Sequence, residues 1–414
     1  MTDSRITQAL KTFSLNPKQY LAAIDRGRDV VVTAGAGSGK TLTLVARYTS
    51  LLAEGIPPRR IAAITFSIKA AREMRARVRQ KLFELGQSSA SEVERQGWVA
   101  LSAQMDAARI STIHSLCAEI LRAHPAEAGI DPRFEIIDES LSAALRIQAV
   151  EDTLKALVEQ NHFAPLLKHI STNDLTEMLK DLLNHRLEAR EIFQRQLEQH
   201  ALINEMLHAR LNNPAIRDLI DELRGLTQRE LVVDAGENLA LMVHELLGMW
   251  VEAESALAGG DLFGCTVPLY QARRTQMDGR KGKRDSWVKT QVAQLRDNFD
   301  QLVNPITGGA KSDDPLPSPE TEVLFSDLLP RLRKAFQTLY QTYQALLDTR
   351  QALDFDDLEQ GALQLLRDEV IRARWQGELD AILVDEFQDT NRRQQDIIEA
   401  LAGPPGRLFI VGGM

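Results

Sequence analysis

Short apolar runs alternate with amphipathic segments over residues 1–125 of the chain. Three runs have the length and the β-branched composition of buried strands: Asp29–Thr33, Arg60–Phe66 and Ala108–Ile113. Apolar residues recur at helical spacing in three further segments: Leu42–Ala53, Ile68–Leu85 and Leu116–Ala123. Strands separated by helices of this length are joined by right-handed crossovers, which predicts a parallel sheet.

The pattern changes between Asp138 and Tyr343, where helical spacing of apolar residues dominates. Two more strand-like runs follow near the end, at Asp380–Val384 and Arg407–Val411. The simplest arrangement is one α/β sheet domain whose sequence is interrupted by a large, mainly α-helical insertion. We expect the sheet domain to comprise residues 1–125 and 350–414, and the insertion to comprise residues 126–349.

Composition narrows the class of protein. A net charge of −9 argues against a histone-like polyanion binder, although it leaves room for local basic patches. Two cysteines, Cys117 and Cys265, form neither a disulfide framework nor a zinc-binding pattern, and they fit a reducing cytoplasm. The apolar stretch Leu239–Gly248 is interrupted by His244 and Glu245, so we expect a cytoplasmic protein without a membrane span.

The segment AGAGSGKT directly follows the first predicted strand and has the form of a phosphate-binding loop. Glycines let successive backbone N–H groups point inward at phosphate oxygens, and the helix that follows adds its positive N-terminal end. We expect Lys40 to reach the β- and γ-phosphates and the Thr41 hydroxyl to bind Mg²⁺. The predicted nucleotide-binding residues are Ala34, Gly35, Ala36, Gly37, Ser38, Gly39, Lys40 and Thr41.

An acidic pair follows a later strand, in the segment AILVDEFQDTN that begins at Ala381. Asp385 is placed to bind Mg²⁺, directly or through water, and Glu386 is placed to position and polarise an attacking water. An Asp-Glu pair at a strand end is by itself a weak signal. Together with the phosphate loop it predicts a nucleotide hydrolase in which Lys40 and Glu386 are the catalytic residues.

These two motifs together resemble the UvrD/Rep-type DNA helicases, which include the AddA and RecB recombination subunits. Four further segments agree in order and spacing: LNPKQ from Leu15, TFSIKAAREMRARV from Thr65, STIHSLC from Ser111 and LDFDDL from Leu353. The form of STIHSLC is closer to AddA and RecB than to UvrD. The resemblance covers residues 15–413, although the helical insertion carries no recognisable signature.

The resemblance implies a RecA-like P-loop NTPase sheet with a helical insertion and an ATP-dependent 3′-to-5′ DNA helicase of repair or recombination. It implies ATP and Mg²⁺ as cofactors, with Gln19 pairing with the purine edge. It also implies single-stranded DNA, duplex DNA and a protein subunit of a recombination complex as partners. The implied DNA-binding residues are Thr65, Phe66, Arg72, Thr112 and His114.

Each DNA contact has a structural alternative. Phe66 suits base stacking in a sequence-tolerant groove, but it also suits a core position at a strand end. On the helix that begins at Ile68, Arg72, Arg75 and Arg79 share one face, and this basic face either contacts phosphates or is merely solvated. Apolar residues form the other face: Ala71, Met74, Val78 and Leu82.

The polar residues of the other motifs also have both a functional and a structural interpretation. Thr112 and His114 can donate to phosphate oxygens, yet a lone histidine is often structural. The three acidic residues of LDFDDL either orient the DNA path or cap a helix, and we favour the capping role: Asp354, Asp356 and Asp357.

The insertion carries one basic patch, between Arg273 and Lys289, with Trp287 among the charges. It suggests phosphate contact with duplex DNA ahead of the motor, against the alternative of a solvated basic loop. The proline-rich stretch Asn304–Glu320 predicts a second exposed loop.

The sequence departs from the helicase pattern at a few positions. Ile68 stands where relatives have a polar residue, and Gly413 replaces an Asp. The printed chain ends at Met414, so the second RecA-like domain and its arginines are absent from it. We therefore expect these 414 residues alone to bind Mg-ATP, to hydrolyse it slowly and not to unwind DNA.

Two other functions compete with this one. The first is a catalytically defective fragment that binds ATP and DNA without unwinding. The second is an SMC- or ABC-like ATPase, which requires a Ser-Gly-Gly signature before the acidic strand. The segment Gln364–Asp380 has no such signature and the insertion lacks sustained heptads, which excludes that class.

Overall fold

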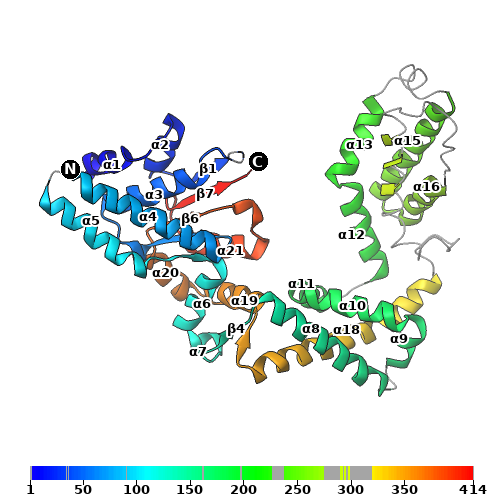
Figure 1. The fold of residues 1–414 in the computed structure, drawn as a ribbon. Coiled ribbons are helices and arrows are strands. Elements are labelled where there is room, and N and C mark those ends of the chain that lie inside the picture. Colours follow the sequence, from blue (N-terminus) through cyan, green and yellow to red (C-terminus); the bar gives the residue numbers. More distant parts are fainter. Residues whose placement is uncertain are drawn as a thin grey trace. The chain divides into compact units, whose positions relative to one another are not determined.

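The computed structural model describes residues 2–33, 35, 37–89, 91–160, 163–195, 198–225, 237–274, 290–291, 293–294, 297–298 and 319–413. The chain divides into two compact units (Figure 1). Unit 1 comprises Met1–Leu145 and Gln344–Met414, and unit 2 comprises Arg146–Tyr343. Two long helices, α8 (Glu139–Val158) and α18 (Pro319–Thr349), run through these divisions without a break, whereas the sequence pattern placed the change at 125/126 and 349/350.

Unit 1 contains a five-stranded sheet in which every pair of neighbours is parallel. Its strands lie in the order β1 (Val30–Thr33), β7 (Leu408–Gly412), β6 (Ala381–Val384), β2 (Ile61–Thr65) and β3 (Ile110–Thr112). The register pairs Thr33 with Gly412, Val384 with Ile410 and Thr65 with Thr112. The parallel α/β sheet predicted from the sequence is confirmed, and the loops that follow its strands emerge at one edge.

Helices cover this sheet on two sides, because alternate strand residues point to opposite faces. Ala63 and Leu383 belong to one apolar cluster, and Ala62 and Ile382 belong to the other. The first cluster draws on α1 (Thr2–Leu10), α2 (Pro17–Ile24), α3 (Lys40–Glu54), α4 (Ile68–Ser88), α5 (Glu92–Gln104) and the 3₁₀ turn η2 (Met105–Ala107). The second draws on α6 (Ile113–Ala123), α7 (Pro125–Ala128), α19 (Phe355–Leu366), α20 (Glu369–Glu378) and α21 (Arg392–Ala402).

Shorter segments complete unit 1. Strands β4 (Glu135–Ile136) and β5 (Ala352–Leu353) form a separate parallel pair. The 3₁₀ turn η1 (Pro58–Arg60) precedes β2, and η4 (Phe387–Asp389) follows β6. The η4 turn therefore lies directly after the predicted Asp-Glu pair.

Strand β1 corrects one expectation. The run Asp29–Thr33 predicts a strand buried on both faces, but the Val31 side chain is 64% exposed. Val30 and Val32 pack against the core on the other face. Val31 is exposed because β1 is an edge strand of the sheet and the described residues cover only one of its faces.

The described part of unit 2 is helical. Between α8 and α18 lie α9 (Ala164–His169), α10 (Thr172–Asn184), α11 (Arg186–Gln194), α12 (Gln199–Leu211), α13 (Pro214–Gly225), α15 (Glu237–Ala258) and α16 (Leu262–Arg274). Helices α12, α13, α15 and α16 share one apolar core around the buried Trp250. The basic patch predicted between Arg273 and Lys289 and the loop at Asn304–Glu320 lie outside the described residues except at their ends. Among the helices that are described, none combines the length and the apolarity of a membrane span.

Both cysteines are buried, one in each unit, and burial raises the pKa of each thiol: that of Cys265 to about 12, with Cys117 also raised. We predict that neither thiol of the folded protein reacts with Ellman's reagent at pH 8, because the thiolate is the reactive form. Cys117→Ser leaves only the thiol of unit 2 and Cys265→Ser only that of unit 1, so their reaction rates report the opening of each unit separately. Both variants should react fully in guanidinium chloride. Rapid labelling of either native variant would contradict the buried positions.

Candidate functional site

The phosphate loop joins β1 to α3. Its backbone is left-handed at Gly37 (φ 77°) and Gly39 (φ 86°), a conformation that glycine adopts without a steric penalty. The Ser38 hydroxyl donates to the Gly35 carbonyl at 2.6 Å and closes a tight turn. Helix α3 then begins at Lys40, so its first backbone N–H groups face the loop. Two predicted loop residues, Ala34 and Ala36, lie outside the described residues.

Gln19 lies against this loop. Its side chain completes a capping box with Asn16 at the start of α2, and its Nε2 also donates to the Ser38 carbonyl at 3.0 Å. A Cβ atom at Gly39 would lie 2.8 Å from that nitrogen, so a larger residue there would displace the end of the Gln19 side chain, and the positive φ of Gly39 also favours glycine. The structure thus brings Gln19 to the loop, while its pairing with a purine stays a prediction.

The loop and the acidic strand end meet through one ion pair. Lys40 Nζ lies 3.0 Å from Glu386 Oε2, although 346 positions separate the two residues in the sequence. Gln388 Nε2 donates to the same Glu386 oxygen at 2.7 Å, and the Gly413 backbone N–H donates to Gln388 Oε1. Hydrogen bonds from Gln388 and Lys40 hold the pKa of Glu386 below its usual value, so this carboxylate is ionised at neutral pH.

Asp385 has a different environment. It directly follows β6, and its backbone N–H donates to the Ile64 carbonyl at 2.9 Å. Its Oδ1 atom is buried without a hydrogen-bond partner among the described residues. Burial raises the pKa of Asp385, and the neighbouring charge of Glu386 raises it further. A buried carboxylate oxygen without a donor is costly unless a cation binds it. These properties fit Mg²⁺, with the half-buried Thr41 on the first turn of α3 as the second predicted ligand.

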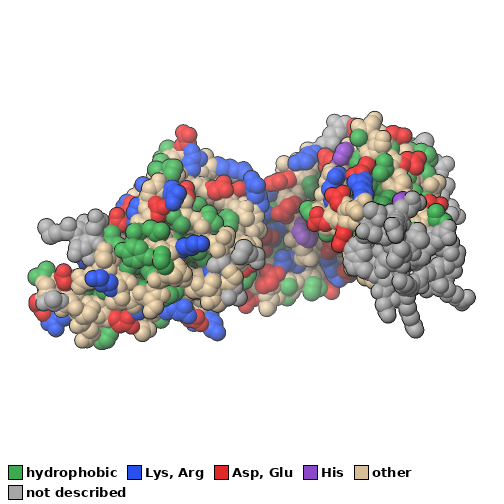
Figure 2. Space-filling model, turned by 90° about the horizontal axis from the view of Figure 1, so that it is seen from above, with side chains coloured by type: hydrophobic (Ala, Val, Ile, Leu, Met, Phe, Trp, Pro, Cys, Tyr) green, Lys and Arg blue, Asp and Glu red, His purple; other side chains and the backbone are tan. Residues whose placement is uncertain are grey.

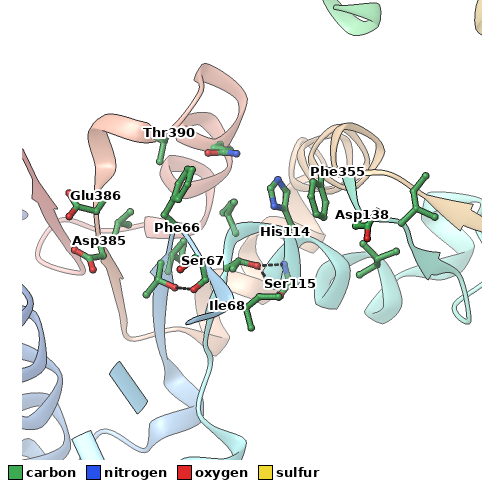
Figure 3. A pocket seen from close by; sticks show the side chains of 18 residues that line it. Phe66, Ser67, Ile68, His114, Ser115, Asp138, Phe355, Asp385, Glu386 and Thr390 are labelled. Carbon is green, nitrogen blue, oxygen red and sulfur yellow. Dashed lines mark hydrogen bonds between the residues drawn. The ribbon is translucent and has the colours of Figure 1, made fainter. Parts of the chain in front are cut away.

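A cavity of about 620 Å³ adjoins the acidic pair, at the ends of β2, β3 and β6. Figure 3 shows Phe66 between Asp385 and Glu386 on one side and the rings of His114 and Phe355 on the other. The Phe66 side chain is 72% exposed, which excludes the alternative that it belongs to the core. Exposed aromatic rings in a cavity are available for stacking with a flat ligand.

Three of the other predicted DNA contacts have protein partners within the cavity wall. Thr65 is buried and donates to the Ser67 carbonyl, and Thr112 caps α6 by accepting from the Ser115 backbone N–H. His114 stacks on Phe355 with ring centroids 4.1 Å apart. The structure therefore brings Thr65, Phe66, Thr112 and His114 to one cavity and gives the two threonine hydroxyls local structural bonds.

The expected basic face of α4 is only partly available. Arg72 is exposed, whereas Arg75 donates to the Ile110 carbonyl at 2.8 Å and Arg79 pairs with Asp106. Two of the three arginines thus hold α4 against its neighbours. The apolar face is buried as predicted, at Ala71, Met74, Val78 and Leu82.

The acidic segment before α19 is a helix cap, as the sequence analysis favoured. The Asp354 side chain accepts from the Asp357 backbone N–H at 3.0 Å, and the Asp357 side chain accepts from the Asp354 backbone N–H. Asp356 lies 3.7 Å from Arg393. These contacts fix the start of α19.

One buried acidic residue, Glu359, was not predicted from the sequence to take part in the site. Glu359 lies on α19 and contacts His114, Asn391, Arg393 and Gln394. A signal was present, because Glu359 occupies a position of the apolar stripe formed by Leu358, Ala362, Leu365 and Leu366. A charged residue on such a stripe predicts a buried polar cluster.

The surface of unit 1 is mixed in character. Figure 2 shows hydrophobic side chains gathered on the face of its left-hand part, with positive and negative side chains interspersed around them. The exposed apolar residues of this unit include Leu21, Val31, Phe66, Ile68 and Phe83. On the face that Figure 2 shows, apolar side chains and charges of both signs therefore lie close together.

Comparison with known proteins agrees with the motifs. The family described as the UvrD/REP helicase N-terminal domain matches residues 15–256 and 308–413. The chain is 27% identical over 441 residues to an ATP-dependent helicase/nuclease subunit of Pediococcus pentosaceus, with 97% of this chain and 34% of that protein covered. The protein of the same name from Geobacillus kaustophilus is 28% identical over 449 residues, with 95% and 34% covered. The one from Latilactobacillus sakei is 26% identical over 434 residues, with 96% and 48% covered.

The chain thus spans about a third to a half of the length of these relatives. The family match includes the phosphate loop, the acidic pair and the cavity at the ends of β2, β3 and β6. It extends over more than half of the chain, and the chain therefore belongs to the UvrD/REP helicase N-terminal domain family.

Proposed function

We propose that this chain is the ATP-binding and single-stranded-DNA-binding motor domain of an ATP-dependent DNA helicase. The observation that carries the proposal is the contact between Lys40 and Glu386, next to the Asp385 Oδ1 atom, which has no hydrogen-bond partner among the residues that the structure describes. A basic loop residue, an ionised carboxylate and a buried carboxylate oxygen are the groups that Mg-ATP requires. Membership of a helicase family supports the same reading.

The chain's own residues supply most of the chemistry. Backbone N–H groups at the start of α3 and the Lys40 ammonium bind phosphate oxygens, while Thr41 and Asp385 hold Mg²⁺. Bound Mg²⁺ neutralises the charge that develops on the phosphates. Lys40 exchanges Glu386 for phosphate, which leaves the Glu386 carboxylate free to accept a hydrogen bond from water and to orient it.

The cavity is the proposed DNA site. Phe66 offers a face for a base, His114 and Phe355 form the opposite wall, and Arg72 follows Ile68 by one helical turn. Phosphates lie outward in this arrangement, toward Arg72. Stacking of this kind is independent of base identity, as a motor that moves along DNA requires.

Activity of the whole protein extends beyond these residues. We propose 3′-to-5′ unwinding in DNA repair or recombination, cytoplasmic location, and single-stranded and duplex DNA as substrates. The word "subunit" in the relatives' names supports a protein partner in a recombination complex. The second candidate, an ATP- and DNA-binding chain without its own unwinding activity, is separated from the first by steady-state ATPase and strand-separation assays with single-stranded and tailed duplex DNA.

Asp385 gives the sharpest test of the nucleotide site. Asp385→Asn should weaken Mg-ATP binding by about ten-fold or more, because it removes a ligand charge, and it should leave binding in EDTA unchanged. Lys40→Ala should weaken binding in both conditions, since Lys40 contacts phosphate directly. Titration of a fluorescent ATP analogue measures both effects.

The matched control is Asp380→Asn, at the opposite end of β6, where Asp380 pairs with Arg60. This variant should bind Mg-ATP like the parent chain. A metal-dependent loss in Asp380→Asn, or none in Asp385→Asn, would refute the assignment of the magnesium ligand.

Phe66 tests the cavity. Phe66→Ala should weaken oligothymidylate binding by about 1–3 kcal/mol, because one stacking surface is lost. Fluorescence anisotropy of a labelled oligonucleotide at fixed salt measures the change. Phe83→Ala is the control, since Phe83 is 63% exposed on α4 and lines a different cavity. Equal affinities of the Phe66→Ala variant and the parent chain would exclude stacking at this position.

A further inference from the structure

Glu359 joins three segments that the sheet places near one another. Its Oε1 atom lies 3.0 Å from His114 Nε2 on α6 and accepts from Gln394 Nε2 on α21 at 2.6 Å. Its Oε2 atom accepts from Asn391 Nδ2 at 3.1 Å and from Arg393 Nη1 at 3.3 Å. Each carboxylate oxygen therefore has two partners, which matches the acceptor capacity of an ionised carboxylate.

The burial of this carboxylate makes those partners necessary. Glu359 is only 2% exposed. Burial alone would raise the pKa of Glu359, but hydrogen bonds from His114, Gln394 and Asn391 outweigh it and hold the pKa below its usual value. Loss of any one donor thus changes the balance of the remaining bonds.

Glu359 and its four partners, His114, Asn391, Arg393 and Gln394, form the Glu359 cluster. Two of these partners belong to the wall of the cavity. His114 and Gln394 share the Oε1 atom, and both line the cavity. The stacked ring of Phe355 holds the other side of His114 (Figure 3). A molecule that enters the cavity and shifts His114 must therefore alter the bonds that Glu359 makes.

The other side of the cluster leads to the acidic pair. Asn391 uses its Oδ1 atom to cap α21, while its Nδ2 atom donates to Glu359. Between Asn391 and Glu386 the chain forms the tight η4 turn, closed by a bond from the Asp389 backbone N–H to the Glu386 carbonyl. Glu386 itself is left-handed (φ 50°), which is uncommon for a residue other than glycine. Because this turn is short and closed by a hydrogen bond, a shift of Asn391 should be transmitted to Glu386.

We propose that Glu359 is a positioning residue that couples the cavity to the nucleotide site. It holds His114, Gln394 and Asn391 in one arrangement, so that DNA in the cavity and Mg-ATP on the phosphate loop change each other's affinity. This coupling rests on the proposed function, because it assumes that the two sites bind these ligands. It assigns to Glu359 a role apart from ligand contact.

Glu359→Gln provides the test. Glutamine keeps the size of the side chain but replaces one of its two acceptor oxygens by an NH₂ group, so the two partners of that oxygen lose their acceptor. The dissociation constant of oligothymidylate is measured on the 414-residue chain with and without a non-hydrolysable ATP analogue and Mg²⁺. Linkage requires the same factor in the reciprocal titration. We expect a factor of about five or more in the parent chain and of less than about two in Glu359→Gln.

Two further variants separate coupling from folding. Asn391→Ser retains a good helix cap but lacks the Nδ2 donor, so it should also reduce the coupling factor. Glu378→Gln removes a carboxylate that pairs with Arg109 outside the cavity, and it should leave the factor unchanged. Thermal melting and the nucleotide affinity without DNA, both expected to match the parent chain, establish that the variants are folded.

The outcomes are distinct. A parent chain that binds neither ligand would refute the proposed function. A parent chain that binds both without mutual effect would refute the coupling alone. Retention of the full factor in Glu359→Gln, or its loss in Glu378→Gln, would likewise overturn the role of Glu359 while the two binding sites stand.

Discussion

The parallel register of the central sheet is the constraint on which the rest of unit 1 depends. Because all five strands run in one direction, the segments that follow β1 and β6 emerge at the same edge, with only β7 between them. That arrangement alone allows Lys40 to reach Glu386 across most of the chain. The long helical sequence between β3 and β6 leaves this register intact, since it enters and leaves the sheet domain through α8 and α18.

Two carboxylates near this edge, that of the buried Glu359 and that of Asp385 with its buried Oδ1 atom, show how local donors decide the role of a charge. Glu359 has four partners and a lowered pKa, so its charge is already balanced by the protein. Asp385 has a buried oxygen without a partner among the described residues and a raised pKa. The first therefore organises its surroundings, whereas the buried oxygen of the second is suited to binding a cation, which would favour its ionised form. The sequence marked Asp385 by its place after an apolar strand, but it did not show which donors surround either carboxylate, because the partners of Glu359 come from other segments of the chain.

The conformation of local motifs could be predicted from the sequence, but the contacts that their side chains make with distant segments could not. The backbone conformation could be predicted for the phosphate loop, from its glycines, and for the strand before Asp385, from its apolar run. Glycine geometry and strand burial are properties of short segments. The periodicity of α4 likewise located its buried face. It could not show that Arg75 and Arg79 bond to Ile110 and Asp106, because those contacts depend on how β3 and η2 pack. The exposure of Val31 depends in the same way on strand order.

If DNA binds in the cavity as proposed, the acidic residues of its wall constrain how the DNA enters. Asp385 and Glu386 line one side, so phosphates on that side would meet like charge at short range. Bases carry no charge, and two exposed apolar side chains of the cavity, Phe66 and Ile68, offer them contact surface. The remaining lining also includes polar side chains and a third carboxylate, that of Asp138. Electrostatics therefore favours an arrangement in which the bases lie inside the cavity and the phosphates lie toward Arg72. In the proposed orientation a base would lie between Phe66 and His114, and His114 is the cavity residue that contacts Glu359.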